Sequence, residues 1–312
     1  MDSNVIVRTI MPIFLLIGTG FVSRKLGVLK SGDERVLNSY VYYFALPSLF
    51  LVNLAETELT QEASMVIIAG IVPIFVALAI HVGLYVVFRF SREALYLLIL
   101  STVFGSLAFF GIPFVTFAFP TARAEKLATL SAAFIAVVSV TISITILELY
   151  RLERSTVSEA FRQVGQRFSR NPLIISILLG VLLSVFRLEI PLPISVSLHM
   201  LGSSTSTVAI FMLGVFLYGR KYVKMTEALK LSLLRILFLP TVALLVTNLL
   251  ELPILESSIL VLMHGMPVAI SMLVLSERYD FYKETIASLI LISSLGAAVY
   301  LNLWLLILGY QW

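Results

Sequence analysis

The sequence predicts an all-α membrane protein that crosses the bilayer many times. Hydrophobic residues make up 59% of the 312 residues and charged residues only 13%, and the mean hydropathy is +1.02. Globular domains, in contrast, carry about 25% charged residues. Apolar stretches of about 17 to 25 residues, the length of a transmembrane helix, recur along the whole chain. The strands of a β-barrel would instead alternate over about 10 residues, so a barrel is excluded.

Prolines, glycines and charges divide the apolar sequence into ten predicted helices. The expected ranges are 5–23, 36–55, 64–88, 94–119, 126–150, 172–187, 195–218, 228–249, 256–277 and 284–309. The longest polar segment, residues 151–171, separates the fifth helix from the sixth. We therefore predict a first five-helix repeat over 1–150, a cytoplasmic linker over 151–171 and a second five-helix repeat over 172–312.

The distribution of Lys and Arg predicts the orientation of these helices. Seventeen of them lie in the linker and in the other loops that follow odd-numbered helices, whereas the opposite side has only Arg8, Arg123, Lys126 and Arg187. Cytoplasmic loops collect Lys and Arg. We therefore expect a multi-pass protein of the cell (inner) membrane with both termini outside. Five helices per half would insert the two halves in opposite senses, which predicts an inverted repeat.

Two predicted helices are interrupted at equivalent places in the two halves. The fourth helix carries Gly105, Gly111 and Pro113, and the ninth carries Gly265 and Pro267. Lipid offers no partner for the backbone groups that such a break releases. Paired broken helices are typical of the substrate site of a carrier. We expect the breaks to form that site, with each helix restarting after its proline.

The chemistry of broken helices favours an anionic substrate. A restarting half-helix presents unpaired N–H groups and the positive end of its dipole. Ser106, Ser271 and His264 adjoin the breaks and would add side-chain donors. A carboxylate would then be bound without a buried arginine. For His264, proton exchange and a structural hydrogen bond to the broken backbone remain open alternatives.

Other polar residues in the spans are also candidates. Five hydroxyl residues follow one another from Ser203 to Thr207, so Ser204 and Thr205 could line the substrate cavity. Hydrogen bonds to carbonyls one turn earlier are the alternative for this run. Glu148 and Arg235 lie near predicted helix ends, where long side chains reach the interface, and we expect them to do so.

Enzymatic activity is not expected from this sequence. It contains no cysteine, no HExxH, no GxSxG and no Walker motif. We expect no cofactor, no metal site and no nucleic-acid partner; the expected partners are a small organic anion and the lipid bilayer. Coupling to protons or to sodium remains open.

Four motifs resemble the auxin efflux carrier family, which contains the plant PIN transporters and bacterial relatives. They are RKLGVL after Gly20, ALPSLFLVNLAE in the second helix, FGSLAFFGIPF in the fourth and GMPVAISMLVLSERYDFYKETIAS from the ninth to the tenth. The resemblance implies a fold similar to that of bile acid sodium symporters and sodium/proton antiporters. In that fold, helices 4 and 9 cross at their breaks, and helices 3–5 and 8–10 move like an elevator past helices 1, 2, 6 and 7. It also implies a homodimer.

One departure from the family pattern bears on the substrate. The family's fourth-helix motif GNTGxxGxP reads Gly105-Ser106 here, and its ninth-helix motif PxAxN ends in Ser271. Serine thus stands where the asparagines that hold the substrate carboxylate would be, and it lacks their reach. We therefore expect a transporter of small organic anions related to auxin carriers but different in substrate. A sodium-coupled symporter of the bile acid type and a non-transporting membrane sensor are the alternatives.

Overall fold

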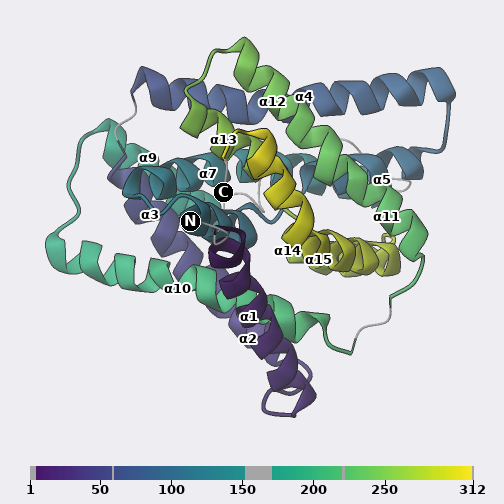
Figure 1. Ribbon diagram of the computed structural model, residues 1–312, viewed down its shortest axis with the longest axis horizontal. Helices are drawn as coiled ribbons and strands as arrows, with labels where there is room; N and C mark the ends of the chain where they lie inside the picture. Colours follow the sequence, from purple (N-terminus) through teal and green to yellow (C-terminus); the bar gives the residue numbers. More distant parts are fainter. Residues whose placement is uncertain (1–4, 58–59, 152–170, 220–221, 311–312) are drawn as a thin grey trace.

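The computed structural model describes residues 5–57, 60–151, 171–219 and 222–310, and these ranges are predominantly helical (Figure 1). The helices of the first half are α1 (Val5–Lys25), α2 (Asp33–Tyr40), η1 (Val41–Ala45), α3 (Leu46–Ala55), α4 (Gln61–Phe88), α5 (Arg92–Val103), η2 (Leu107–Gly111), α6 (Ile112–Ala118) and α7 (Ala122–Arg151). Those of the second half are α9 (Pro172–Val185), α10 (Leu192–Leu217), α11 (Met225–Leu233), η4 (Leu234–Phe238), α12 (Leu239–Leu249), α13 (Ile254–His264), α14 (Ile270–Tyr279) and α15 (Lys283–Ile307). The predicted linker lies almost wholly outside the described residues.

Each predicted helix coincides with one helix or with consecutive helical pieces, and the bounds differ by at most four residues. Five helical stretches are individually long and apolar enough to cross a membrane: Gln61–Phe88, Ala122–Arg151, Leu192–Leu217, Met225–Leu249 and Lys283–Ile307. The all-α membrane class is therefore confirmed. The inverted repeat and the resemblance to symporter folds stay predictions.

The helices pack in two groups. In the first, α1 lies along α10, and α3 packs against α9 and α10. The α1–α10 contact is so close that a Cβ on Gly20 would lie 2.0 Å from the carbonyl oxygen of Phe211, and one on Gly214 would lie 1.9 Å from that of Ile17. Glycines allow such approach between membrane helices. In the second group, α4 packs against α7 and α12, α12 against α13, and α11 against α15.

Three helices contain a widened π-helical turn, and each widening comes just before a proline. The π-helical segments η1, η2 and η4 end two residues before Pro47, Pro113 and Pro240 respectively. Proline lacks an N–H group, and its ring clashes with the carbonyl one turn earlier. A wider turn removes that clash. These prolines therefore bend helices without interrupting them.

The C-terminal end of α7 and the described parts of the loops that follow α1, α4, α10 and α14 gather at one end of the protein. The Tyr150 ring lies 4.8 Å from that of Phe281, the Tyr282 hydroxyl donates to Glu93 over 3.1 Å, and the Val223 N–H donates to the Ser288 hydroxyl over 3.0 Å. We call this the basic end, because its described residues include Arg24, Lys25, Lys30, Arg35, Arg89, Arg92, Arg151, Lys224, Lys230 and Lys283.

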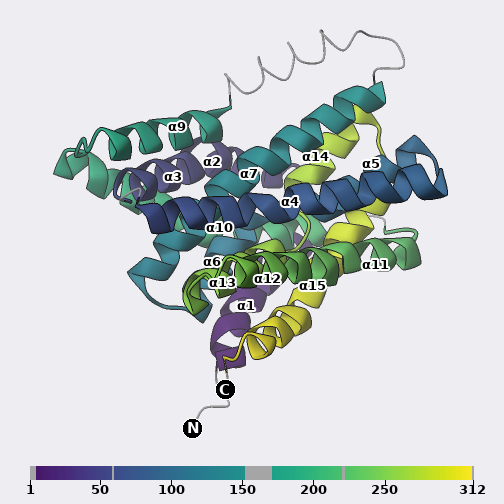
Figure 2. The same cartoon turned by 90° about the horizontal axis from the view of Figure 1, so that it is seen from above.

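The opposite end joins the two helix groups. The Lys126 ammonium at the start of α7 donates to the carbonyl oxygen of Glu56 at the end of α3 over 3.3 Å. Slightly deeper, the Asn53 amide donates to the Thr129 hydroxyl over 3.2 Å, and both side chains are buried. The start of α1 and the end of α15 lie on the same side of the protein in Figure 2. The groups therefore touch at this end through the contact of α3 with α7.

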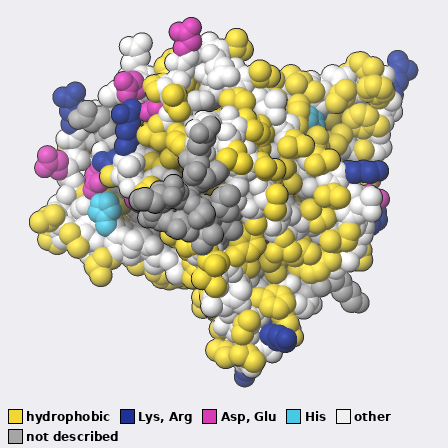
Figure 3. Space-filling model, in the orientation of Figure 1, with side chains coloured by type: hydrophobic (Ala, Val, Ile, Leu, Met, Phe, Trp, Pro, Cys, Tyr) yellow, Lys and Arg dark blue, Asp and Glu magenta, His cyan; other side chains and the backbone are white. Residues whose placement is uncertain are grey.

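The surface between the two ends is largely apolar. Figure 3 shows hydrophobic side chains across most of the face, with charged ones mainly towards its edges. Large apolar side chains with more than half of their surface exposed include Met200, Leu192, Leu249, Val299 and Phe88. An apolar belt of this breadth is what contact with lipid tails requires.

Candidate functional site

The two broken helices cross and pair with each other at their breaks. Phe104, Gly105 and Ser106, between α5 and η2, form an antiparallel bridge with Pro267, Val268 and Ala269, between α13 and α14. The Ser106 N–H donates to the Pro267 carbonyl over 2.7 Å, and the Ala269 N–H donates to the Phe104 carbonyl over 3.1 Å. Each break thus supplies partners for backbone groups of the other, as burial in an apolar interior demands. We call these six residues the crossover.

The first break lies earlier in the chain than the sequence predicted. We expected it at Gly111 and Pro113, with the helix restarting after the proline. The structure instead places the break at 104–106 and leaves Pro113 within the first turn of α6, directly after the widened turn η2. The second break, at 265–269, contains Gly265 and Pro267 as expected.

Arg235 lies at the centre of the crossover and is fully buried, with 0% of its surface exposed. Its Nε donates to the Met266 carbonyl over 2.8 Å, its Nη1 to those of Thr102 (2.8 Å) and Val103 (3.4 Å), and its Nη2 to that of Met263 (3.3 Å). The expectation that Arg235 reaches the interface is therefore wrong. The physical reason is that both α5 and α13 end here, and their terminal carbonyls attract a cation.

Glu148 on α7 was also expected to reach the membrane interface, and this expectation is wrong too. Only 4% of this residue is exposed, and its carboxylate accepts a hydrogen bond from the Tyr279 hydroxyl on α14. A neighbouring helix thus supplies a donor where we expected water.

Two of the predicted glycines have distinct packing roles at the crossover. A Cβ on Gly105 would lie 1.6 Å from Nη2 of Arg235, so the guanidinium occupies the space that any side chain would need. A Cβ on Gly111 would lie 2.8 Å from the sulfur of Met263, where η2 passes α13. Gly265 is different, because its nearest contact would be an ordinary 3.4 Å. Gly105 and Gly111 therefore allow the close crossing itself.

Ser106 and His264 are both buried at the crossover. Ser106 is 7% exposed and begins η2 without a side-chain cap bond. His264, the last residue of α13, is fully buried, and its Nε2 lies 3.0 Å from the Gly70 carbonyl of α4. A carbonyl accepts only, so Nε2 carries the proton, and Nδ1 has no hydrogen-bond partner among the described residues. This geometry favours the structural alternative for His264.

The main-chain N–H groups at the breaks are less available than we expected. Those of Ser106 and Ala269 are used in the bridge, and that of Val268 donates to the Ser293 hydroxyl over 3.1 Å. The next two residues, Ile270 and Ser271, begin α14, and their N–H groups have no backbone partner outside the helix among the described residues. Free donors are therefore found at the start of α14 rather than in the crossover.

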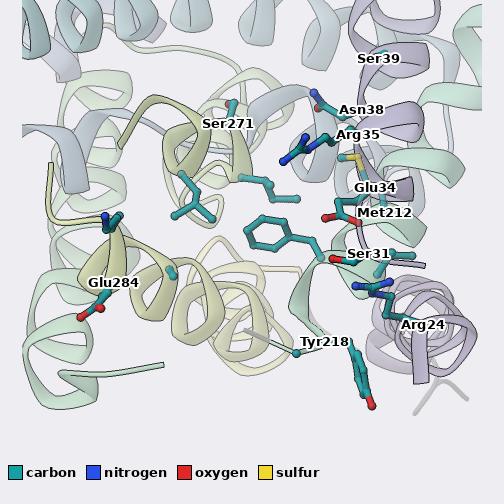
Figure 4. Close-up of a pocket in the computed structure, with 17 residues that line it drawn as sticks. Arg24, Ser31, Glu34, Arg35, Asn38, Ser39, Met212, Tyr218, Ser271 and Glu284 are labelled. Atoms are coloured by element: carbon teal, nitrogen blue, oxygen red, sulfur yellow. The ribbon is translucent and has the colours of Figure 1, made fainter. Parts of the chain in front are cut away.

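A cleft of about 740 Å³ opens at the basic end between the two helix groups, and Ser271 lies on its wall (Figure 4). From the first group it is lined by Arg24, Ser31, Glu34, Arg35, Asn38, Ser39, Met212, Val215, Phe216, Tyr218 and Gly219. From the second it is lined by Ile270, Ser271, Leu273, Lys283, Glu284 and Ala287. Three cations and two carboxylates thus face the space. In Figure 4, Arg35 and Asn38 project from α2 towards the side of the cavity where Ser271 lies.

The hydroxyl run of α10 lies away from this cleft. The Ser204 hydroxyl donates to the Leu201 carbonyl over 2.7 Å and lies 2.8 Å from the Tyr40 hydroxyl, while Ser203 bonds to Met200 over 2.9 Å. Thr205 is fully buried, and its hydroxyl has no partner among the described residues. Neither Ser204 nor Thr205 lines the cleft. The bonds of Ser203 and Ser204 follow the local alternative for this run.

The structure thus separates the predicted site residues into three places. Gly105, Ser106, His264, Gly265 and Pro267 lie at or beside the crossover, together with Gly111 and Pro113 where η2 passes into α6. Ser271 lies in the cleft, and Ser204 and Thr205 lie in the packing of α10. Sequence reasoning missed Arg35, Asn38 and the central position of Arg235. A signal for Arg235 was present, because it is the one Lys or Arg that the sequence analysis assigned to neither side of the membrane.

Comparison with known proteins agrees with this architecture. Residues 5–305 match the family described as membrane transport protein. The uncharacterized transporter MJ1031 of Methanocaldococcus jannaschii is 25% identical over 304 residues, which cover 95% of this chain and 96% of that protein. The uncharacterized transporter YfdV of Escherichia coli is 23% identical over 309 residues, 95% of each chain. The chain therefore belongs to the membrane transport protein family, the family of the auxin efflux carriers.

Proposed function

We propose that the protein is a secondary transporter of small organic anions, with carboxylates as the substrate class. The observation that carries this proposal is the cleft, in which Arg35 and Asn38 from one helix group face the exposed Ser271 at the start of α14. An arginine offers a planar pair of donors that matches a carboxylate. The first turn of α14 adds two N–H groups and the positive end of a helix dipole.

Alternating access follows from the packing of the two helix groups. They are separated by the cleft at the basic end and joined at the other end through Asn53 with Thr129 and Lys126 with Glu56. Movement of the group that contains the crossover past the group of α1, α3, α9 and α10 would close the cleft and open the opposite end. We propose this elevator-type movement as the mechanism.

The basic end is proposed to face the cytoplasm, because cytoplasmic loops collect Lys and Arg. Both termini would then lie outside the cell membrane, because the start of α1 and the end of α15 lie away from the basic end (Figure 2). A tag at either terminus tests this in intact cells: labelling by an impermeant reagent is expected, and labelling only after permeabilisation would contradict the orientation.

Transport itself is tested with the purified protein in liposomes. Radiolabelled monocarboxylates, dicarboxylates and aromatic carboxylates are supplied, and uptake is compared with that of protein-free liposomes. Saturable uptake of at least one class is expected. Binding without uptake would favour a membrane sensor, while uptake that requires a sodium gradient would favour a symporter of the bile acid type.

A homodimer is a further proposal, which rests on the resemblance to the family. Crosslinking of the purified protein in detergent and in membranes measures it, and a band of twice the mass is expected.

A further inference from the structure

The buried charge of Arg235 is balanced by carbonyl groups. Within the described residues, the hydrogen bonds of its guanidinium run to main-chain oxygens, those of Thr102, Val103, Met263 and Met266. Among the described residues, no carboxylate forms an ion pair with it. Burying a cation is costly unless its charge and its donors are matched. The electrostatic partner of Arg235 is therefore the set of helix ends around it.

These carbonyls form a cation site because they belong to the C-terminal ends of two helices. Thr102 and Val103 end α5, and Met263 lies in the last turn of α13, so a continuous helix no longer supplies the N–H group four residues further on. The Val103 and Met263 carbonyls accept one weaker bond each, from the N–H groups of Gly105 (3.2 Å) and Met266 (3.3 Å), and each oxygen keeps a second lone pair for a cation. The C-terminal ends of two half-helices also bring about half a negative charge each to the same place. In broken-helix carriers, such freed carbonyls and helix ends coordinate sodium. Here a guanidinium from η4 fills the position.

The residues around the crossover provide space for this guanidinium. Gly105 has no side chain where Nη2 lies, since a Cβ there would be 1.6 Å away. The widened turn η4 carries Arg235 towards the crossover and precedes Pro240 by two residues. Arginine keeps its charge at any pH that a cell meets, so this cation cannot leave by diffusion or deprotonation.

We propose that Arg235 is a permanent internal cation of the crossover, which occupies a carbonyl site for a monovalent metal ion and makes the intact protein independent of sodium there. Removing the guanidinium exposes a latent site for sodium. The inference deepens the proposed function, because it selects sodium-independent transport over sodium symport. Its main test needs no transported substrate.

The test is thermal unfolding of the purified protein in sodium chloride and in choline chloride of equal ionic strength. The variants are Arg235→Ala and Arg235→Gln, which remove the charge, and Arg235→Lys, which keeps it. Leu239→Ala is the matched control, because Leu239 is fully buried one turn further along the same helical stretch and makes an apolar cavity when truncated.

We expect the wild type, Arg235→Lys and Leu239→Ala to unfold at the same temperature in both salts. Arg235→Ala and Arg235→Gln should unfold at a lower temperature than the wild type and regain several degrees in sodium but not in choline. Millimolar methylguanidinium should also raise the unfolding temperature of Arg235→Ala and leave Leu239→Ala unchanged.

A sodium-specific rise in the wild type would overturn the proposal, and so would equal responses of Arg235→Ala and Leu239→Ala. If neither neutral variant can be purified, the wild type and Arg235→Lys still decide, since each must be insensitive to sodium. Flux in liposomes separates the two proposals. Transport that needs sodium would refute the internal cation, whereas no transport of any anion would refute the proposed function and leave the unfolding result standing.

Discussion

The crossover and the cleft are adjacent, yet their polar groups differ: those of the crossover are buried and bonded within the protein, and those of the cleft are exposed. At the crossover, the guanidinium of Arg235 and the bridge N–H groups are buried and bonded to the protein itself. In the cleft, two residues beyond the bridge, Ser271 is exposed and faces Arg35. A buried polar group must be paired inside the protein, which leaves it unavailable to a ligand. The broken helices therefore stabilise the fold where they cross, and we propose that they bind substrate beside the crossing.

The largest effect is expected from Gly105→Ala, which would bring a methyl group into the guanidinium of Arg235. Displacing a buried charge from its partners should cost on the order of 3 kcal/mol or more in unfolding free energy. Gly265→Ala is the matched variant at the other break, where the added carbon has ordinary contacts, and it should change this free energy by less than about 1 kcal/mol. Denaturant unfolding measures both, and equal losses would refute the distinction.

The second largest effect is expected from Arg35→Ala, which should weaken transport without changing the stability of the protein. Loss of a hydrogen bond to a charged ligand is worth about 1.5–3 kcal/mol, so the KM for the anion should rise roughly tenfold or more. The stability of the protein should stay that of the wild type because Arg35 is exposed. Arg92→Ala is the control, since Arg92 is exposed at the same end but does not line the cleft. An equal rise in KM for both variants would mean that only the general charge of this end matters.

Two serine variants compare the cleft with the crossover directly. Ser271→Ala removes an exposed hydroxyl of the cleft, and one neutral hydrogen bond of about 1 kcal/mol corresponds to a KM raised roughly fivefold. Ser106→Ala alters the buried crossover, and its KM should change less. Uptake at several substrate concentrations measures both. A larger effect at Ser106 would return the substrate site to the crossover, as the sequence alone predicted.

The smallest effect is expected from ionic strength. Shortening the Debye length from about 10 Å towards 3 Å should weaken attraction of an anion to the exposed cations of the cleft, with a rise in KM of about twofold. The buried hydrogen bonds of Arg235 should not depend on ionic strength, so the unfolding temperature should not fall as salt is added. Titration with an impermeant salt at constant osmolarity checks this, and a constant KM would argue against electrostatic attraction in the cleft.

The sequence predicted the helices well because their signals are local. Hydrophobic length and charged loop residues locate each helix to within four residues, since lipid imposes the same requirement on every span. The position of the first break could not be predicted in this way. Pro113 is the stronger local signal, but a widened turn accommodates it, and the chain opens instead at 104–106, where the second break supplies partners.

The sequence by itself thus determined an α-helical membrane protein, two interrupted helices and the loops in which basic residues concentrate. Only the tertiary structure decided that the breaks pair with each other, that the guanidinium of Arg235 binds carbonyls beside both breaks, and that Ser271 rather than Ser106 faces an open cleft. The reason is physical. Hydropathy depends on neighbours along the chain, whereas the pairing of a freed carbonyl or a buried charge depends on residues that are distant in the sequence, such as Thr102, which lies 133 positions from Arg235.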